Sequence, residues 1–436
     1  MNILLRRSIL TALALILSSV SLWSQYVLDQ YYQQGELKYE DHIYKPGIST
    51  VKFHPADNPL AMPAVALGRG QFLDLSFDDL YADYMNLSYT VIHCNADWTP
   101  SNLLKQEYIP RIQEGYLQRY AYSINALIPY TNYRLTLPNE DMTITKSGNY
   151  LLVVYVSGDE TDLVLTRRFM VFEDKVSVGG QVKRARRVEL MNDHQEIDFF
   201  ISHPNYQFQD PFTDLKVTLM QNQRWDNTIT DLKPQFMQNN QLLYQYDEEN
   251  TFPGNNEYRF FDLKNMQALS QNVRRISRDS VFTAFLKVDE PRAISRYSVT
   301  PDVNGQFVIR RLDANDSETE ADYIYVDFLL AYDQPIRESD VYVFGKLTDW
   351  KLLPTFKMKY NYDRKAYQAK VLLKQGYYNF SYAILNDEEM SADLATIEGS
   401  HWETENSYQI LVYNRQVGER YDRLIGFGEL SSEDLY

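Results

Sequence analysis

Short segments rich in aromatic and β-branched residues most constrain what this chain can fold into. The 436 residues include 35 tyrosines, 21 phenylalanines and 5 tryptophans. Many of them stand in runs such as 150–156 and 323–330, which suit the pleated, half-buried surface of a strand. Turn-rich breaks separate these runs at intervals of roughly 10 to 20 residues, which is typical of β-sandwiches rather than of βαβ units. The sequence therefore predicts an all-β fold of tandem immunoglobulin-like or early-set β-sandwich domains.

Further strands are predicted wherever the same character recurs: residues 87–93, 167–172, 197–201, 215–220, 341–344, 377–384 and 408–413. Helix is predicted over residues 102–113 alone.

The N-terminal residues predict export from the cytoplasm. Arg6 and Arg7 precede an apolar run over 9–17, and serines follow as far as Ser24. A charged start, an apolar segment too short to span a bilayer and a small-residue exit are typical of a secretory signal peptide. We expect residues 1–24 to be removed, which places the mature chain outside the cytoplasm. The alternative is an uncleaved anchor.

The charge of the chain argues against several classes of partner, and its cysteine content excludes stabilisation by an intramolecular disulfide. Without its signal peptide the chain holds 41 basic and 59 acidic residues, a formal charge of −18, so nucleic acid and anionic membranes are poor partners. The acidic runs, among them Asp78-Asp79, are interpreted as solvated loop charge. Cys94 is the single cysteine, so no intramolecular disulfide forms, and we expect it to be a buried, small apolar residue.

Closing strands and hinges suggest where the domains end. The strand predicted over 166–172 is followed by a predicted linker at 175–180, and another closing strand over 280–288 precedes a hinge at Pro291. The predicted division is a signal peptide and three sandwiches, at residues 1–24, 25–175, 176–291 and 292–436.

Catalytic and metal-binding motifs do not stand out in the sequence. It contains no His-Glu-x-x-His, Gly-x-Ser-x-Gly or Gly-x-x-x-x-Gly-Lys, and its six histidines show no metal-ligand spacing. His93 and Cys94 are neighbours on a predicted strand and therefore point to opposite faces. Glu403 and Glu405 would share one face of a strand, which is a weak acid–base hypothesis. The sequence thus predicts no enzyme activity, no cofactor and no metal.

The predicted third domain resembles the early-set immunoglobulin-like modules that accompany glycan-active enzymes. The resemblance lies in VYVFG at 341–345, Trp350, KVLL at 370–373, GYY at 376–378 and FSY at 380–382. In some of these modules a tryptophan stacks on a sugar, whereas Trp350 could equally cap the sandwich core.

The whole chain resembles the plug protein family of the type IX secretion system of diderm bacteria, formerly a domain of unknown function. The matching blocks follow in order: HCNADW at 93–98 with Pro100-Ser101, SGNY at 147–150, LTRRF at 165–169, PGNNEYRFFD at 253–262, DVNG at 302–305, ADY at 321–323, TEN at 404–406, Tyr413 and YDRLIG at 421–426. Each block alone would be weak, but together they cover nearly all of the mature chain.

The resemblance implies a periplasmic protein, peripherally associated with the outer membrane, that reversibly closes the periplasmic opening of a large outer-membrane β-barrel translocon. Its partners would be that barrel and other secretion-system components, with no nucleic acid and no membrane span in the mature chain. The alternative function is a secreted or surface glycan-binding protein that holds sugar on Trp350.

Docking on a partner should use aromatic and arginine anchors. The candidates are Trp98, Asn256, Glu257, Arg259, Trp350 and Trp402. For each of them, turn formation or core packing is the competing explanation. A basic cluster follows the predicted linker and would meet lipid head groups or an acidic barrel rim, unless it is simply a charged strand face: Lys183, Arg184, Arg186 and Arg187.

Overall fold

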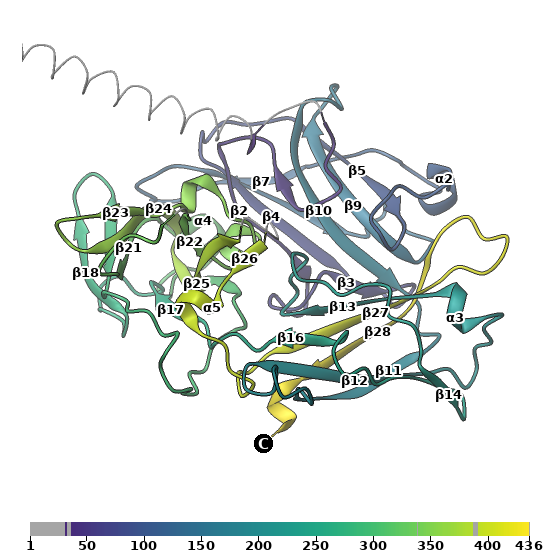
Figure 1. Ribbon diagram of the computed structural model, residues 1–436. Helices are drawn as coiled ribbons and strands as arrows, with labels where there is room; N and C mark the ends of the chain where they lie inside the picture. The colour runs from purple at the N-terminus through teal and green to yellow at the C-terminus, as the bar shows by residue number, and fades with distance from the viewer. Residues whose placement is uncertain (1–30, 33–35, 338, 387–390, 436) are drawn as a thin grey trace, which may run out of the picture.

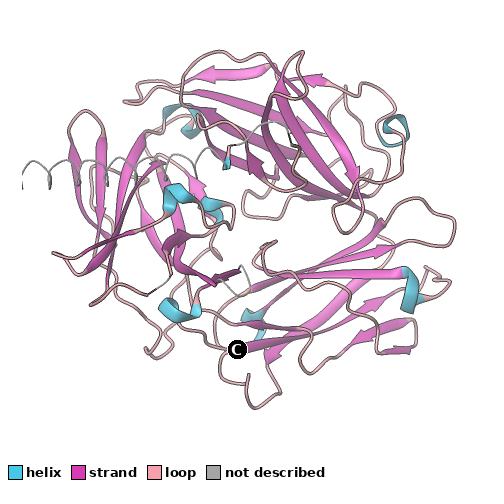
Figure 2. Ribbon diagram, turned by 45° about the horizontal axis from the view of Figure 1, so that its top comes forward, coloured by secondary structure: helices cyan, strands magenta, loops and turns pink. Residues whose placement is uncertain are grey.

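The computed structural model describes residues 31–32, 36–337, 339–386 and 391–435, so the predicted signal peptide lies outside the described residues. The described residues form three β-sandwiches that pack against one another (Figure 1), and their strands are antiparallel except for the pairs β3–β10 and β19–β21. Strands dominate and helices are short (Figure 2). Within the described residues, no helix is long and apolar enough to cross a membrane. The predicted all-β sandwich fold is confirmed.

The first sandwich places two sheets face to face around a core that includes Phe77, Tyr133 and Phe169. One sheet has the order β1 (His42–Ile43), β10 (Leu163–Phe172), β9 (Gly148–Val156), β5 (Leu87–Cys94) and β6 (Gly115–Tyr116), with β3 (Ala64–Ala66) parallel to β10. The other has the order β2 (Ile48–Pro55), β4 (Leu73–Asp79), β8 (Thr131–Leu137) and β7 (Arg119–Tyr122).

The second sandwich is built from two distant stretches of chain. One sheet has the order β11 (Ser177–Arg184), β12 (His194–Ser202), β15 (Gln241–Tyr244) and β14 (Phe236–Gln238), with β16 (Thr251–Pro253) on β12. The other consists of β13 (Leu215–Gln221), β27 (Ser407–Asn414) and β28 (Arg423–Ser431). The last two strands of the chain therefore complete the second sandwich.

The third sandwich lies between these two stretches in sequence. Its first sheet has the order β17 (Arg259–Asp262), β25 (Gly376–Asn386) and β20 (Phe307–Ile309), with β22 (Val341–Phe344) and β26 (Ser391–Asp393) also on β25. The facing sheet has the order β18 (Val273–Arg278), β19 (Phe282–Leu286), β21 (Tyr323–Ala331), β24 (Ala366–Lys374) and β23 (Lys359–Asn361).

Short helical turns connect the strands: α2 (Lys105–Tyr108), α3 (Pro211–Asp214), α4 (Ser317–Glu320), α5 (Ala395–Glu398), η1 (Lys346–Thr348), η2 (Pro354–Phe356) and η3 (Ser432–Leu435). The helix predicted over 102–113 is thus a single turn. Ile109 leaves the helical region, with φ −127° and ψ 87°, because Pro110 follows it and disfavours helix at the preceding residue.

The strand pairing differs from the predicted domain boundaries. β19, which corresponds to the closing strand predicted for the second domain, belongs to a sheet of the third sandwich. β27 pairs with β13 rather than with a strand of the third sandwich, so residues 292–436 do not form one domain. Such pairings join segments far apart in sequence, and local patterns carry no signal for them.

The linker predicted at 175–180 is also wrong, because β11 begins at Ser177. The two glycines of this segment permit close approach of strands. A Cβ on Gly180 would lie 2.4 Å from the backbone oxygen of Asp198 on β12.

The first and second sandwiches stack into four layers, with the β9 and β27 sheets facing each other (Figure 1). On β9, Leu152 packs into the first sandwich's own core, while its neighbour Val153 packs into the layer shared with β27. On β27, Ile410 and Leu411 divide in the same way between the second core and the shared layer. Because both faces are covered, these strands are apolar throughout instead of alternating.

Candidate functional site

The predicted docking residues are gathered at the junctions between the sandwiches. Trp98 is 7% exposed, Trp350 5% and Glu257 2%. Asn256 is buried as well, whereas Arg259, whose side chain is 9% exposed, and Trp402 are half-buried. These side chains are therefore occupied by contacts within this chain.

Trp98 belongs to the junction between the first and second sandwiches. Its ring meets that of Trp225 edge to face at 5.1 Å, and the Arg168 guanidinium lies 4.4 Å from the Trp98 ring centre and 5.1 Å from that of Trp225. A guanidinium cation that lies between two indole rings in a buried layer is energetically favourable. Cys94 is buried in the same layer, as predicted, and burial raises the pKa of its thiol to about 12, which leaves it unreactive at neutral pH.

Polar groups around the buried Asp422 reinforce this junction. Its carboxylate accepts a hydrogen bond from the backbone N–H of Ala96 in the first sandwich and pairs with Lys216 and Arg415 of the second, at 3.0, 3.1 and 2.9 Å. Arg423 pairs with Glu173 at 3.0 Å across the same boundary. The YDRLIG block at 421–426 thus ties the last strand to the first domain.

Arg259 anchors β17 within the third sandwich, close to the junction with the second. Its Nε lies 2.9 and 3.1 Å from the two carboxylate oxygens of Glu398, and Nη1 lies 2.9 Å from Asp289. Glu398 is buried, and although burial opposes its ionisation, Arg259 and Arg292 hold its pKa below the usual value.

The residues before Arg259 complete this junction. The Asn256 side chain donates to the Glu398 backbone oxygen at 2.7 Å, and Glu257 accepts from the hydroxyl of Tyr297 at 2.5 Å. Glu257 also accepts from the N–H of Glu405 at 3.2 Å. The PGNNEYRFFD block is therefore a structural crossing between two sandwiches.

Trp350 is enclosed where the second and third sandwiches meet. Tyr258, Phe344 and Arg224 surround it, with ring or guanidinium centres at 6.0, 5.6 and 5.3 Å. Trp350 belongs to a buried apolar cluster, which favours the core-capping interpretation over sugar stacking. Trp402 lies beneath the guanidinium of Arg184 at 5.3 Å.

The predicted basic cluster is neutralised by neighbouring acids. Lys183 pairs with Glu196 and Asp198, Arg186 with Glu196, and Arg187 with Glu248. Lys183 and Arg184 stand on β11, and Arg186 and Arg187 follow it. The ion pairs of three of these four residues favour the interpretation as a charged face that needs no partner. The acid–base hypothesis for Glu403 and Glu405 assumed that both residues share one face of a strand. That assumption is wrong because both residues precede β27.

A buried ion pair at the junction of the first and third sandwiches escaped the sequence analysis. Lys374 Nζ at the end of β24 lies 2.6 Å from Asp78 Oδ2 on β4, and the two side chains are 0% and 1% exposed. Tyr323 and Asn132 each donate to Asp78 at 2.8 Å, and Lys374 also lies 4.2 Å from the ring centre of Tyr130. Asp78 is therefore not loop charge.

Burial shifts both members of this pair towards their neutral forms. It raises the pKa of Asp78 and lowers that of Lys374, while their mutual attraction opposes both shifts. The surrounding hydrogen bonds satisfy the remaining polar atoms, which is the condition for a buried pair to be tolerated. In the sequence, the only local signs of this site were two pairs of polar residues: Lys374-Gln375 at the end of a strand and Asp78-Asp79 within one.

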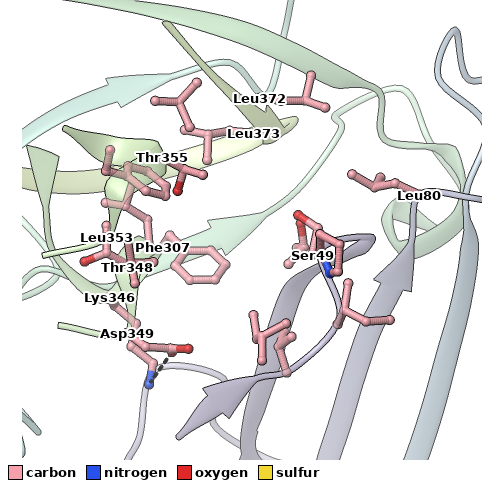
Figure 3. A pocket seen from close by; sticks show the side chains of 18 of the residues that line it. Ser49, Leu80, Phe307, Lys346, Thr348, Asp349, Leu353, Thr355, Leu372 and Leu373 are labelled. Carbon is pink, nitrogen blue, oxygen red and sulfur yellow. Dashed lines mark ion pairs between the residues drawn. The ribbon is translucent and has the colours of Figure 1, made fainter. Parts of the chain in front are cut away.

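A cavity of 260 Å³ lies between the first and third sandwiches (Figure 3). Leu80 and Ser49 face it from the first sandwich, and Phe307 and Leu373 from the third. Arg167 of the first sandwich pairs with Asp349 in its wall at 2.9 Å. The described lining of this cavity contains no histidine and no cysteine. Nor does any group of three or more His, Cys, Asp or Glu in the described ranges come together to hold a metal.

Three sandwiches joined by buried ion pairs and indole contacts define a multidomain all-β protein. Residues 48–173 match the family described as "Type 9 secretion system plug protein 1st domain". A solved structure of a hypothetical protein from Parabacteroides merdae is 36% identical with a TM-score of 0.87, over 91% of this chain and 100% of that one. The chain belongs to the type 9 secretion system plug protein family.

A second solved structure, the native conformation of α-2-macroglobulin from E. coli, is 9% identical over 91% of this chain and 23% of that one, with a TM-score of 0.17 that supports no argument. No curated protein matches the chain. The family resemblance predicted from the sequence blocks is confirmed, and it connects the chain with type 9 secretion.

Proposed function

We propose that this chain is a periplasmic plug, which reversibly closes the periplasmic opening of the large outer-membrane β-barrel translocon of the type 9 secretion system. The observation that carries the proposal is the family match over the first sandwich, residues 48–173. The signal-peptide pattern at 1–24 supports export to the compartment where such a plug would act.

The way the sandwiches are joined supports a mechanical role. A stopper must keep its shape while it is displaced and returned. Here each sandwich is joined to both of the others. Trp98 and Trp225 join the first to the second, Arg224 and Trp350 join the second to the third, and Lys374 and Asp78 join the third to the first. Three junctions of this kind close a triangle, so that no sandwich can move without breaking two sets of buried contacts.

The proposal includes no enzymatic activity and no cofactor. Arginines and carboxylates that could serve chemistry are engaged in buried ion pairs, as with Arg259 and Glu398. The proposed partners are the barrel and other components of the secretion system, with the plug held peripherally at the outer membrane.

Gentle detergent extraction of native outer membranes tests the proposal. The full chain is captured through a C-terminal tag, and co-purifying proteins are identified and quantified by mass spectrometry. The plug function predicts one very large β-barrel in near-equal amount. The variant Lys374→Glu, which places two carboxylates in one buried site, should recover less barrel, whereas Lys357→Glu on the surface should recover as much as the natural chain.

Recovery of the chain alone, under every extraction condition, would refute the plug function. An independent readout is entry of a large polar dye into cells that lack the chain. An unsealed translocon predicts faster entry, and restoration by the natural chain and by Lys357→Glu.

A further inference from the structure

The edge strand β18 of the third sandwich carries three exposed arginines in an otherwise acidic protein. Arg274, Arg275 and Arg278 make up this set, referred to below as the arginine edge. β18 pairs with β19 alone, so its other side lies at the end of the sheet. Figure 1 shows it on the outer side of the third sandwich, turned away from the other two.

The arginine edge differs from the basic cluster of β11 because its charges are not neutralised. Within the described part of the chain, none of its three arginines forms an ion pair, whereas Lys183, Arg186 and Arg187 all do. The nearest acid along the chain is the exposed Asp279, so the strand keeps a local positive charge on a protein of formal charge −16.

The guanidinium groups are held on both faces of the strand. Arg275 lies 4.1 Å from the ring centre of Phe285, its partner across the ladder, and Arg278 lies 5.3 Å from that of Phe282. Arg275 and Arg278 are three positions apart and therefore project from opposite faces. Stacking on aromatic rings restrains both side chains before any partner arrives, which lowers the entropic cost of binding.

We infer that the arginine edge is a docking site for an extended acidic segment of a partner protein, which adds to the sheet as a strand beside β18. The backbone at the free edge supplies hydrogen bonds, and the arginines flank the incoming strand on both faces and pair with its carboxylates. This inference does not depend on the plug function.

An added strand fits this geometry better than a membrane does. A flat anionic surface can meet only one face of β18 at a time, so it would leave Arg275 or Arg278 unused. The overall negative charge of the protein also opposes approach to an anionic bilayer.

Fluorescence anisotropy of a labelled peptide tests the inference with the full mature chain. The probe is a short peptide that alternates glutamate with valine. One control peptide replaces each glutamate by lysine, and a second keeps the charges but replaces every valine by proline, which cannot pair along a strand. Phosphatidylglycerol vesicles serve as the membrane probe.

The matched variants carry the same change of charge. The first reverses the arginine edge, with Arg274→Glu, Arg275→Glu and Arg278→Glu together. The second reverses three other exposed arginines, Arg69, Arg111 and Arg364. Circular dichroism and thermal unfolding establish that both remain folded. If the edge variant does not fold, Arg275→Gln with Arg278→Gln takes its place.

The inference predicts that the glutamate peptide binds the natural chain, that added salt weakens binding, and that reversal of the arginine edge lowers affinity at least about tenfold. The matched variant should bind as the natural chain does, and the proline peptide should not bind. Equal binding of the proline peptide, equal loss in both variants, no peptide binding, or binding to vesicles alone would each overturn the inference. In those cases the arginines serve only to keep the edge from pairing.

Discussion

Lys374 and Asp78 are 296 residues apart in sequence, yet Lys374 Nζ lies 2.6 Å from Asp78 Oδ2 in a site closed to solvent. The pair joins the end of β24 to β4 and so fastens the third sandwich to the first. An apolar layer fastens the first sandwich to the second, so the two junctions should respond differently to mutation and to pH.

Removing the lysine should destabilise the protein strongly. Lys374→Met leaves Asp78 buried without its cation, which predicts a loss of about 3–5 kcal/mol in the free energy of unfolding. Urea unfolding followed by tyrosine and tryptophan fluorescence measures the change. The matched control is Lys357→Met, which breaks the half-exposed pair with Asp340 and should cost less than about 1 kcal/mol. Similar losses in the two variants would contradict the role given to burial.

Two effects require glycine at position 305, a positive φ and a close contact, and only the first of them applies at Gly158. The φ of Gly305 is +77°, and a Cβ there would lie 2.2 Å from the Trp350 ring, whereas Gly158 has φ +90° with nothing within 4 Å. Gly158→Ala should therefore cost about 1–2 kcal/mol, from backbone strain alone. Gly305→Ala adds the clash with Trp350 and should lower the free energy of unfolding by a further amount of about 1–3 kcal/mol, which is typical of overpacking. Thermal unfolding of the two variants side by side gives the difference. Equal shifts would mean that Trp350 moves aside freely.

Trp98 should act through its packing rather than through its indole N–H. That N–H is buried and has no hydrogen-bond partner in the structure. Trp98→Phe should therefore cost much less than Trp98→Ala, for which about 3–5 kcal/mol is expected. Denaturant midpoints measure both. A loss from Trp98→Phe as large as that from alanine would show that the indole ring itself, through the Arg168 stacking, dominates the junction.

His93 should make stability depend on pH between about 4 and 6.5. Burial lowers its pKa to about 4, and its ring contacts Ser101 Oγ at 2.9 Å and the Ser147 backbone oxygen at 3.0 Å. The unfolded chain then binds a proton in this range that the folded chain excludes. Stability from this group is therefore present above about pH 6.5 and is lost as the pH falls towards 4.

The comparison with His93→Gln isolates this effect, because other groups act in the opposite direction. Burial raises the pKa of Asp302 to about 7, so its contribution to stability is present at low pH and declines as the pH rises towards 7. The difference in unfolding free energy between the natural chain and His93→Gln should shrink by up to about 1.4 kcal/mol for each pH unit below 6.5. Parallel pH profiles for the two proteins would refute the assignment to His93.

Local sequence patterns were sufficient for the strands and for the family. The runs at 150–156 and 323–330 lie within β9 and β21, because side-chain character and period act over a few neighbouring residues. The same logic selected Trp98, Trp350 and Arg259 as interface residues by their chemistry. In the structure, Trp98 and Trp350 lie at junctions within this chain and Arg259 lies in an ion-pair network of the third sandwich, while their role in docking stays a prediction.

The sequence by itself determined that this protein is an all-β chain of the plug family, since aromatic periodicity and ordered motif blocks are local and additive. Only the tertiary structure decided that β27 and β28 complete the second sandwich, that Asp78 meets Lys374, and that the arginines of β18 form no ion pair within the described residues. These features depend on which distant surfaces come together. The burial of whole sheet faces determines which surfaces pack together, and a short segment of sequence carries no information about it.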